Sequence, residues 1–199
     1  MRWFHRERPV YVVAGFRRSG TTMLMQALEA GGVRVDIAPA GAPDREYYEL
    51  SHDQRAHGWP DYEHPERTEL PYTERFPVAH KGRAIKCLSG MAQYLAPIPA
   101  GYVVVFIHRS PDAISRSAAV KWGYGFRADD IARSVAADLL VWRDRTDCPV
   151  TLVELDYDDV LRDPIAAMQQ LQAAGFPIRH VNRAAKVIDG NRPHLQVVA

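Results

Sequence analysis

The stretch Gly15-Phe16-Arg17-Arg18-Ser19-Gly20-Thr21-Thr22 decides the fold of this chain. An apolar run, 11–14, precedes it and an amphipathic run, 23–28, follows it, which predicts a strand, a glycine-bounded loop and a helix. Such a loop cradles phosphate, because its glycines let backbone N–H groups turn inward and the helix N-terminus adds about half a positive charge. The alternative is a strand–turn–helix corner that binds nothing.

The spacing of the two glycines is that of the ATP-binding P-loop, Gly-x-x-x-x-Gly-Lys-Ser/Thr. Thr21 stands where that motif has its lysine, and the positive charge lies at Arg17 and Arg18, inside the loop. An ATPase without the lysine lacks its main contact with the terminal phosphates. The loop therefore predicts a phosphorylated ligand other than plain ATP.

Length and composition favour a single domain over all 199 residues. The hydrophobic and charged fractions, 47% and 25%, are ordinary for a soluble globular protein, and the net charge of +1 argues against a general nucleic-acid binder. Cys87 and Cys148 have no metal-ligand or redox spacing, which predicts reduced core residues and a cytoplasmic setting. The sequence shows no signal peptide and no apolar run of membrane-spanning length.

The rest of the chain alternates between strand-like and helix-like runs. The strand-like runs are 11–14, 33–37, 84–88, 101–107 and 150–155, and the longest, 101–107, is continuously apolar. The helix-like runs are 21–30, 111–120, 129–145 and 163–174. Continuous apolar strands are typical of a parallel sheet covered on both faces. We therefore predict an α/β, three-layer, P-loop NTPase-like fold with a central, mainly parallel sheet flanked by helices.

Residues 38–83 interrupt this alternation. They are rich in proline, histidine, tyrosine and acidic residues, and they show no clean period. A connection of this length inside a compact domain is usually functional, so we predict a lid that faces the substrate. The alternative is a disordered insertion.

A second basic site follows the longest apolar run. Arg109 comes directly after it, and Ser117 lies two turns into the helix that follows. Ligands of open α/β sheets bind at the carboxyl ends of the strands, so Arg109 should face the same side as the loop 15–22. A guanidinium and a hydroxyl that converge on one point suit a second phosphate. The alternative is that Arg109 caps the helix or pairs with Asp112; His108 is assigned a structural role.

These motifs resemble those of the PAPS-dependent sulfotransferases, whose donor is 3′-phosphoadenosine-5′-phosphosulfate. The loop 15–22 resembles the family's 5′-phosphosulfate loop, and segment 109–117 its 3′-phosphate motif. Segments 155–164 and 187–192 are similar to a "YEDL…DP" stretch and to a C-terminal basic segment of bacterial members. The resemblance runs from about residue 11 to residue 195. It implies a P-loop fold, PAPS as sulfuryl donor, PAP as product, and transfer without a metal.

The resemblance also implies which residues bind the donor. They are Arg17, Arg18, Ser19, Gly20, Thr21, Thr22, Arg109, Ser117 and Arg192. Sulfuryl transfer builds charge on the leaving phosphate oxygen, and Arg18 with the loop N–H groups can neutralise it. Lys86 matches the lysine of a Lys–Thr–His triplet in cytosolic members, so we assign Lys86 and Arg18 to catalysis. The family usually has lysine at the Arg18 position; arginine keeps the charge but makes a forked contact.

The general base is the least determined residue. Leu88 occupies the position of the triplet's histidine and cannot take a proton. Another branch, which includes the heparan N-sulfotransferases, uses a glutamate before an aromatic pair, and Glu46 precedes Tyr47 and Tyr48 here. An aromatic wall can raise the pKa of a carboxyl toward neutrality, so we predict Glu46 as the base; the alternative is a solvated surface charge. The further candidates are Glu49, His80 and His52.

Two other functions stay open. A P-loop kinase is one, because the apolar run that ends at Asp156 would suit a magnesium-binding aspartate. A non-catalytic PAP-binding protein is the other, because of Leu88. The sequence does not identify the acceptor, which we expect to be a small molecule or a glycan, and it leaves a homo-oligomer open. The aromatic residues of segment 122–126 could line an acceptor pocket or form a turn at the edge of the core.

Overall fold

The computed structural model describes residues 7–35 and 81–190. Four parallel strands form one sheet in the order β2-β1-β3-β4. They are β1 (Val10–Gly15), β2 (Ala84–Leu88), β3 (Tyr102–His108) and β4 (Val150–Asp156). An isolated parallel bridge joins Val35 to Ala84, which adds one pairing beyond the β2 edge. Because the strands are parallel, the loops that follow them meet at one edge of the sheet.

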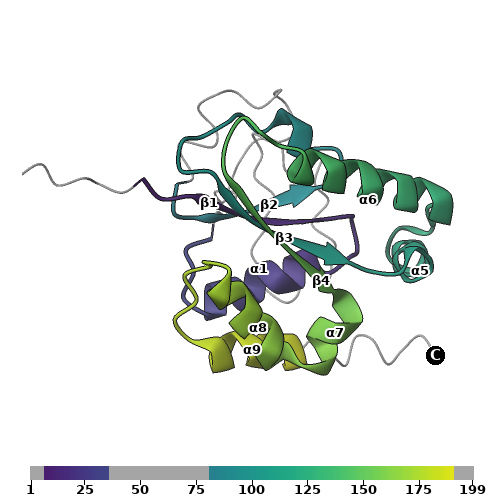
Figure 1. The fold of residues 1–199 in the computed structure, drawn as a ribbon. Helices are drawn as coiled ribbons and strands as arrows, with labels where there is room; N and C mark the ends of the chain where they lie inside the picture. The colour runs from purple at the N-terminus through teal and green to yellow at the C-terminus, as the bar shows by residue number, and fades with distance from the viewer. Residues whose placement is uncertain (1–6, 36–80, 191–199) are drawn as a thin grey trace, which may run out of the picture.

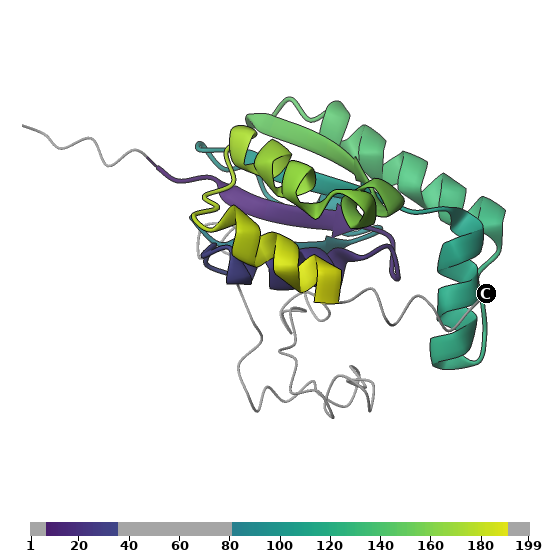
Figure 2. The ribbon, with the colours of Figure 1, turned by 90° about the horizontal axis from the view of Figure 1, so that it is seen from below.

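Helices cover both faces of the sheet. They are α1 (Thr21–Ala30), the 3₁₀ turn η2 (Ala92–Tyr94), α5 (Pro111–Trp122), α6 (Ala128–Arg143), α7 (Tyr157–Arg162), α8 (Pro164–Ala173) and α9 (Val181–Gly190). In Figure 1, α6 lies on one side of the sheet and α1, α8 and α9 lie on the other. Figure 2 shows α5 projecting beyond the strand ends, next to one end of α6. The predicted α/β fold class, with a parallel sheet between helical layers, is confirmed.

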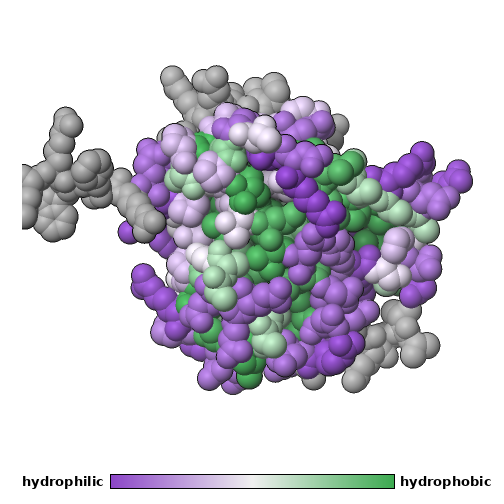
Figure 3. All heavy atoms as spheres, viewed as in Figure 1, coloured by the Kyte–Doolittle hydropathy of each residue, from purple (hydrophilic) through white to green (hydrophobic). Residues whose placement is uncertain are grey.

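Each face of the sheet has its own apolar core. On β1, Val13 packs toward α1, α8 and α9, whereas Val12 packs toward α6. Leu24 and Leu28 fill the first core from α1, and Trp142 fills the second from α6. The alternation explains why the strands read as continuous apolar runs, since both faces are buried. In Figure 3, a band of hydrophobic residues crosses the middle of the visible face between hydrophilic surfaces above and below.

The structure differs from the predicted elements in several places. The helix predicted over 129–145 spans Ala128–Arg143, and the helix predicted over 163–174 is preceded by a separate short helix, α7. The basic segment 187–192 overlaps the end of α9, which the sequence did not predict. Helix α9 buries Ala184 and Ile188 against α1 and α8, and this tertiary contact cannot be predicted from a local sequence pattern.

Some predictions fall outside the described residues. The strand predicted over 33–37 is described only as far as Val35, and most of the lid predicted over 38–83 lies in 36–80. The lid and the single domain over 1–199 therefore stay predictions. Within the described part of the chain, none of the helices has the length and apolar character needed to cross a membrane.

Candidate active site

The loop between β1 and α1 has the backbone of a phosphate cradle. Gly20 has a φ of 106° and immediately precedes α1, and no side chain of the described residues caps that helix. A Cβ at Gly20 would lie 2.6 Å from Cδ2 of Tyr157, so only glycine fits there. Among the described residues, Arg18 is the only non-glycine residue with a positive φ, 69°. This left-handed backbone conformation is uncommon for a residue with a side chain. The first turn of α1 is therefore left open for an anion.

Ser19 adds a buried hydroxyl to this cradle. The residue is 1% exposed, and its Oγ has no hydrogen-bond partner among the residues that the structure describes. The hydroxyl lies close to the start of the loop, because a Cβ at Gly15 would be 2.6 Å from it. A buried hydroxyl without a partner costs free energy, and a phosphate oxygen would satisfy it.

Arg18 connects the loop to α5. Its Nε donates a hydrogen bond of 3.1 Å to Oγ of Ser117, ninety-nine residues further along the chain. Burial lowers the pKa of Arg18, and the neighbouring charge of Arg109 lowers it further. Two guanidinium groups that repel each other in a partly buried site are stabilised by a shared anion. Arg18 thus links the loop to Ser117, and the expected convergence of Arg109 with Ser117 on one point stays a prediction.

Arg109 is held between the loop and β4. Its Nη1 donates a 2.8 Å hydrogen bond to the carbonyl oxygen of Arg18, and its guanidinium lies 4.3 Å from the ring centroid of Tyr157. The ring of Tyr157 is 7% exposed and sits at the start of α7, directly after β4. A cation over an aromatic face is stabilised, so Tyr157 supports Arg109 from one side. These two contacts explain the position of Arg109 without the ion pair with Asp112 that was the alternative.

Lys86 reaches the same loop from β2. The residue is 6% exposed, and its Nζ donates to Oγ1 of Thr22 at 3.3 Å. Thr22 belongs to the first turn of α1, so an ammonium group lies beside the open helix terminus. Leu88, two residues further on the same strand, is 8% exposed and carries no titratable group.

The predicted residues do not all gather. Hydrogen bonds link Arg18 with Arg109 and Ser117, and Lys86 with Thr22, whereas Arg17 is exposed and enters none of these bonds. Glu46, Glu49, His52, His80 and Arg192 lie outside the described residues. The base and the C-terminal basic contact therefore remain predictions.

Tyr157 is a site residue that the sequence reasoning did not single out. It packs against Gly20 and under Arg109, so it touches both halves of the site. Its hydroxyl has a raised pKa because of burial, and the charges of Arg109 and Arg18 act in the opposite direction. The signal that could have found it is its position one residue after an apolar strand, at the same sheet edge as the loop.

Aromatic rings flank the Arg18 side of the site. Phe16 of the loop contacts Phe126 edge-on at 5.4 Å, and Trp122 stacks with Tyr124 at 6.1 Å. Arg18 lies 5.9 Å above the ring of Trp122. Tyr124 is 59% exposed, so the cluster lies at the surface and not inside either core. The cluster lies next to Arg18, and its role as a wall of an acceptor pocket stays a prediction.

His108 makes a hydrogen bond outside this constellation. Its Nε2 lies 2.9 Å from Oε2 of Glu154 on β4, and Arg143 of α6 pairs with the same carboxylate. The hydrogen bond from Arg143 lowers the pKa of Glu154, and His108 contributes in the same direction. The three side chains join β3, β4 and α6, as expected for a structural histidine.

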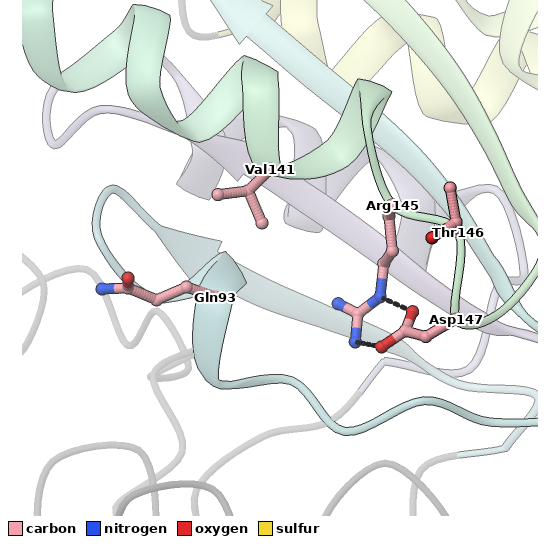
Figure 4. A pocket seen from close by; sticks show the side chains of 5 residues that line it. All are labelled: Gln93, Val141, Arg145, Thr146 and Asp147. Atoms are coloured by element: carbon pink, nitrogen blue, oxygen red, sulfur yellow. Dashed lines mark hydrogen bonds and ion pairs between the residues drawn. The ribbon is translucent and has the colours of Figure 1, made fainter.

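A separate pocket of about 350 Å³ lies near the amino ends of the strands, away from the loop. Figure 4 shows its lining, with Arg145 and Asp147 paired across one side. Nε of Arg145 donates to Asp147 at 2.8 Å, and its guanidinium also binds the carbonyl oxygen of Leu95. The guanidinium of Arg145 thus has its hydrogen-bond partners within the protein, and we assign this pocket no ligand.

The described residues contain no group of three histidine, cysteine, aspartate or glutamate side chains that could hold a metal ion. Asp156, the candidate magnesium ligand of the kinase alternative, has another role. Its carboxylate accepts hydrogen bonds from the N–H groups of Asp158, at 2.8 Å, and Asp159, and so caps α7.

Comparisons with known proteins concern the fold. No protein-family model and no curated protein sequence matches this chain. The chain is similar to the sulfotransferase STF1 of Mycobacterium tuberculosis H37Rv, with a TM-score of 0.49, 16% identity and coverage of 92% of this chain and 70% of that one. A retinol dehydratase solved with androsterone and the inactive cofactor PAP has a TM-score of 0.44, 17% identity and coverage of 92% and 65%.

A gluconokinase of Sinorhizobium meliloti 1021 is also similar, with a TM-score of 0.39, 16% identity and coverage of 97% of this chain and 99% of that one. Each of these TM-scores is below 0.5.

Proposed function

We propose that this protein is a sulfotransferase that moves a sulfuryl group from PAPS to a hydroxyl or amine of an acceptor. The observation that carries the proposal is the contact between the cationic loop after β1 and the second basic site, Arg109 with Ser117. The loop after β1 is open to one phosphate, and Arg109 with Ser117 offers a second, with Arg18 bonded to both members of the second site. PAPS carries phosphate groups at two ends, whereas ATP carries them in one chain.

The loop supplies the donors for the phosphosulfate end. The backbone of the first turn of α1, the buried hydroxyl of Ser19 and the guanidinium of Arg18 would donate to its oxygens. Arg109 and Ser117 would hold the 3′-phosphate, and a planar guanidinium can bind two of its oxygens at once. Arg17 and Arg192 are proposed as outer contacts of the same ligand.

The transfer step needs charge stabilisation at the leaving group. A lone pair of the acceptor attacks sulfur while the bond from sulfur to the bridging phosphate oxygen breaks, and PAP leaves with that electron pair. Arg18 and Lys86 would meet the charge that develops on this oxygen. One preorganised donor of this kind is commonly worth about a hundredfold to a thousandfold in rate. The sulfuryl group carries less charge than a phosphoryl group, so the step does not demand a magnesium clamp.

The acceptor must lose a proton in the same step. Glu46 is the proposed base, and Glu49, His80 and His52 are the alternatives. The aromatic cluster of Phe16, Trp122, Tyr124 and Phe126 lies beside Arg18, and we propose it as one wall of the acceptor site. A cytoplasmic location stays part of the proposal.

A kinase is the second candidate, and the geometry counts against it. Thr21 replaces the P-loop lysine, and the carboxylate of Asp156 is occupied as a helix cap. Thermal shifts with PAP, ADP and ATP–magnesium distinguish the two. A ligand at about one hundred times its dissociation constant adds nearly 3 kcal/mol to the free energy of unfolding. We expect PAP to raise the melting temperature most; equal shifts with ADP would contradict the assignment of Arg109 and Ser117.

A further inference from the structure

Asp138 is a buried carboxylate that the proposed mechanism does not use. It lies in α6, on the face of the sheet opposite α1, and is 6% exposed. Burial raises its pKa, while the N–H of Gly90 and the neighbouring Ser89 hydroxyl act in the opposite direction. Buried carboxylates are rare and cost stability, so this position calls for a reason other than packing.

The carboxylate fixes the turn that follows β2. Oδ1 of Asp138 accepts a 2.9 Å hydrogen bond from the N–H of Gly90. Gly90 has a φ of 84°, a left-handed conformation that glycine adopts without strain. The turn is closed by a 3.1 Å bond from the N–H of Met91 to the carbonyl oxygen of Leu88. Asp138 thus holds the turn from outside.

The same turn contacts the first residue of the phosphate loop. The N–H of Ser89 donates a 3.2 Å hydrogen bond to the carbonyl oxygen of Gly15. The strand that leads into the turn carries Lys86, whose Nζ bonds Thr22. One turn therefore connects the start of the loop with the strand that delivers the catalytic lysine, and Asp138 is its anchor.

We propose that Asp138 is a positioning residue that keeps Lys86 and the loop in register, by way of Gly90, Ser89 and Gly15. This inference rests on the proposed function. Small displacements of a catalytic group are costly, since an error of about 1 Å can reduce a rate by about a hundredfold. Arg109, directly after β3, and Ser117, in α5, make their hydrogen bonds with Arg18, so the second phosphate site should be unaffected.

Three variants and a control test this role. Asp138→Ala removes the acceptor, and Asp138→Asn keeps an oxygen that can accept from Gly90. Gly90→Ala leaves Asp138 intact but strains the turn; its new Cβ would meet no atom within 4 Å, so the strain is conformational only. Asp130→Ala, on an exposed part of the same helix, is the control.

Turnover, PAP affinity and amide hydrogen exchange are measured well below the melting temperature. We expect Asp138→Ala and Gly90→Ala to lower kcat about tenfold to a hundredfold and to change the affinity for PAP less than about threefold. Asp138→Asn, which keeps an acceptor oxygen, should retain most of the parent's kcat. Exchange at Ser89, Gly90 and the loop 15–20 should accelerate in Asp138→Ala. A lower melting temperature with unchanged kcat would overturn the inference, because Asp138 would then be structural only.

The readouts separate the two proposals. If the unmodified protein has no sulfotransferase activity, the proposed function fails, and hydrogen exchange alone decides the inference. Faster exchange in the loop 15–20 of Asp138→Ala would still support coupling through the turn. Acceleration restricted to Ser89 and Gly90 would refute it.

Discussion

Replacement of Arg109 by alanine tests the second phosphate site most sharply. In the free protein, Arg109 bonds the carbonyl oxygen of Arg18 at 2.8 Å and lies 4.3 Å from the ring centroid of Tyr157. Losing the hydrogen bond and the cation–π contact should cost about 1–2 kcal/mol of stability. The loss is partly offset, because Arg109 no longer lowers the pKa of Arg18. The free variant should therefore remain folded.

The effect on the ligand should be larger and specific. Truncation of one partner of a buried charge pair costs about 2–5 kcal/mol. A loss of 2–4 kcal/mol in binding corresponds to about 30-fold to 1,000-fold weaker binding of PAP. AMP has no 3′-phosphate, so its affinity should change by only a small factor. Arg109→Lys keeps the charge without the planar fork, so its affinity for PAP should lie between that of the parent protein and that of Arg109→Ala.

Isothermal titration of the parent and of Arg109→Ala with PAP and AMP gives the comparison. Arg116→Ala is the matched control, since Arg116 is an exposed arginine on α5, the helix that follows Arg109. If PAP and AMP lose the same factor, Arg109 acts by supporting the loop through the carbonyl of Arg18. That result would refute its role as the 3′-phosphate ligand.

Three further substitutions probe the loop, the lysine and the base. Gly20→Ala should weaken PAP binding at least tenfold and lower the melting temperature, because a Cβ would meet Tyr157 at 2.6 Å and the φ of 106° would be strained. Calorimetry measures the melting temperature and titration the affinity. Unchanged affinity for PAP would contradict phosphate binding by this loop. Lys86→Ala should lower kcat by about a hundredfold with little change in PAP affinity, since Lys86 meets charge that develops during transfer. Loss of binding with unchanged kcat would show that its role is misassigned. Glu46→Gln should lower kcat by about a hundredfold to ten-thousandfold and leave PAP affinity intact, and full activity would exclude Glu46 as the base.

The parts of the site that follow from local pattern were predictable. Gly15 and Gly20 bound a loop between a strand and a helix, and the backbone angles agree with that pattern. Arg109 was expected on the side of the loop because parallel strands end at one edge of the sheet, and its bond to the carbonyl oxygen of Arg18 agrees with this. The bond from Arg18 to Ser117 places Ser117 beside the loop as well. Proximity does not establish their roles, which stay predictions.

The parts that depend on tertiary packing were not predictable. Whether Arg17 or Arg18 turns inward depends on the positive φ of Arg18, which no residue pattern specifies. The contact between Tyr157 and Gly20 joins elements more than one hundred residues apart, and the bond from Gly90 to Asp138 joins a turn to the middle of a helix. Such contacts arise from how layers pack and not from periodicity.

The central claim, sulfuryl transfer from PAPS, is tested by incubating the protein with ³⁵S-labelled PAPS and a panel of phenols, alcohols, amines and glycans. We predict that label moves to at least one acceptor while one PAP is released for each labelled product, and that Arg18→Ala abolishes the transfer. Parallel incubation with γ-labelled ATP and magnesium should leave every acceptor unlabelled. Transfer of phosphate from ATP, or binding of PAPS without transfer to any acceptor, would contradict the proposed function.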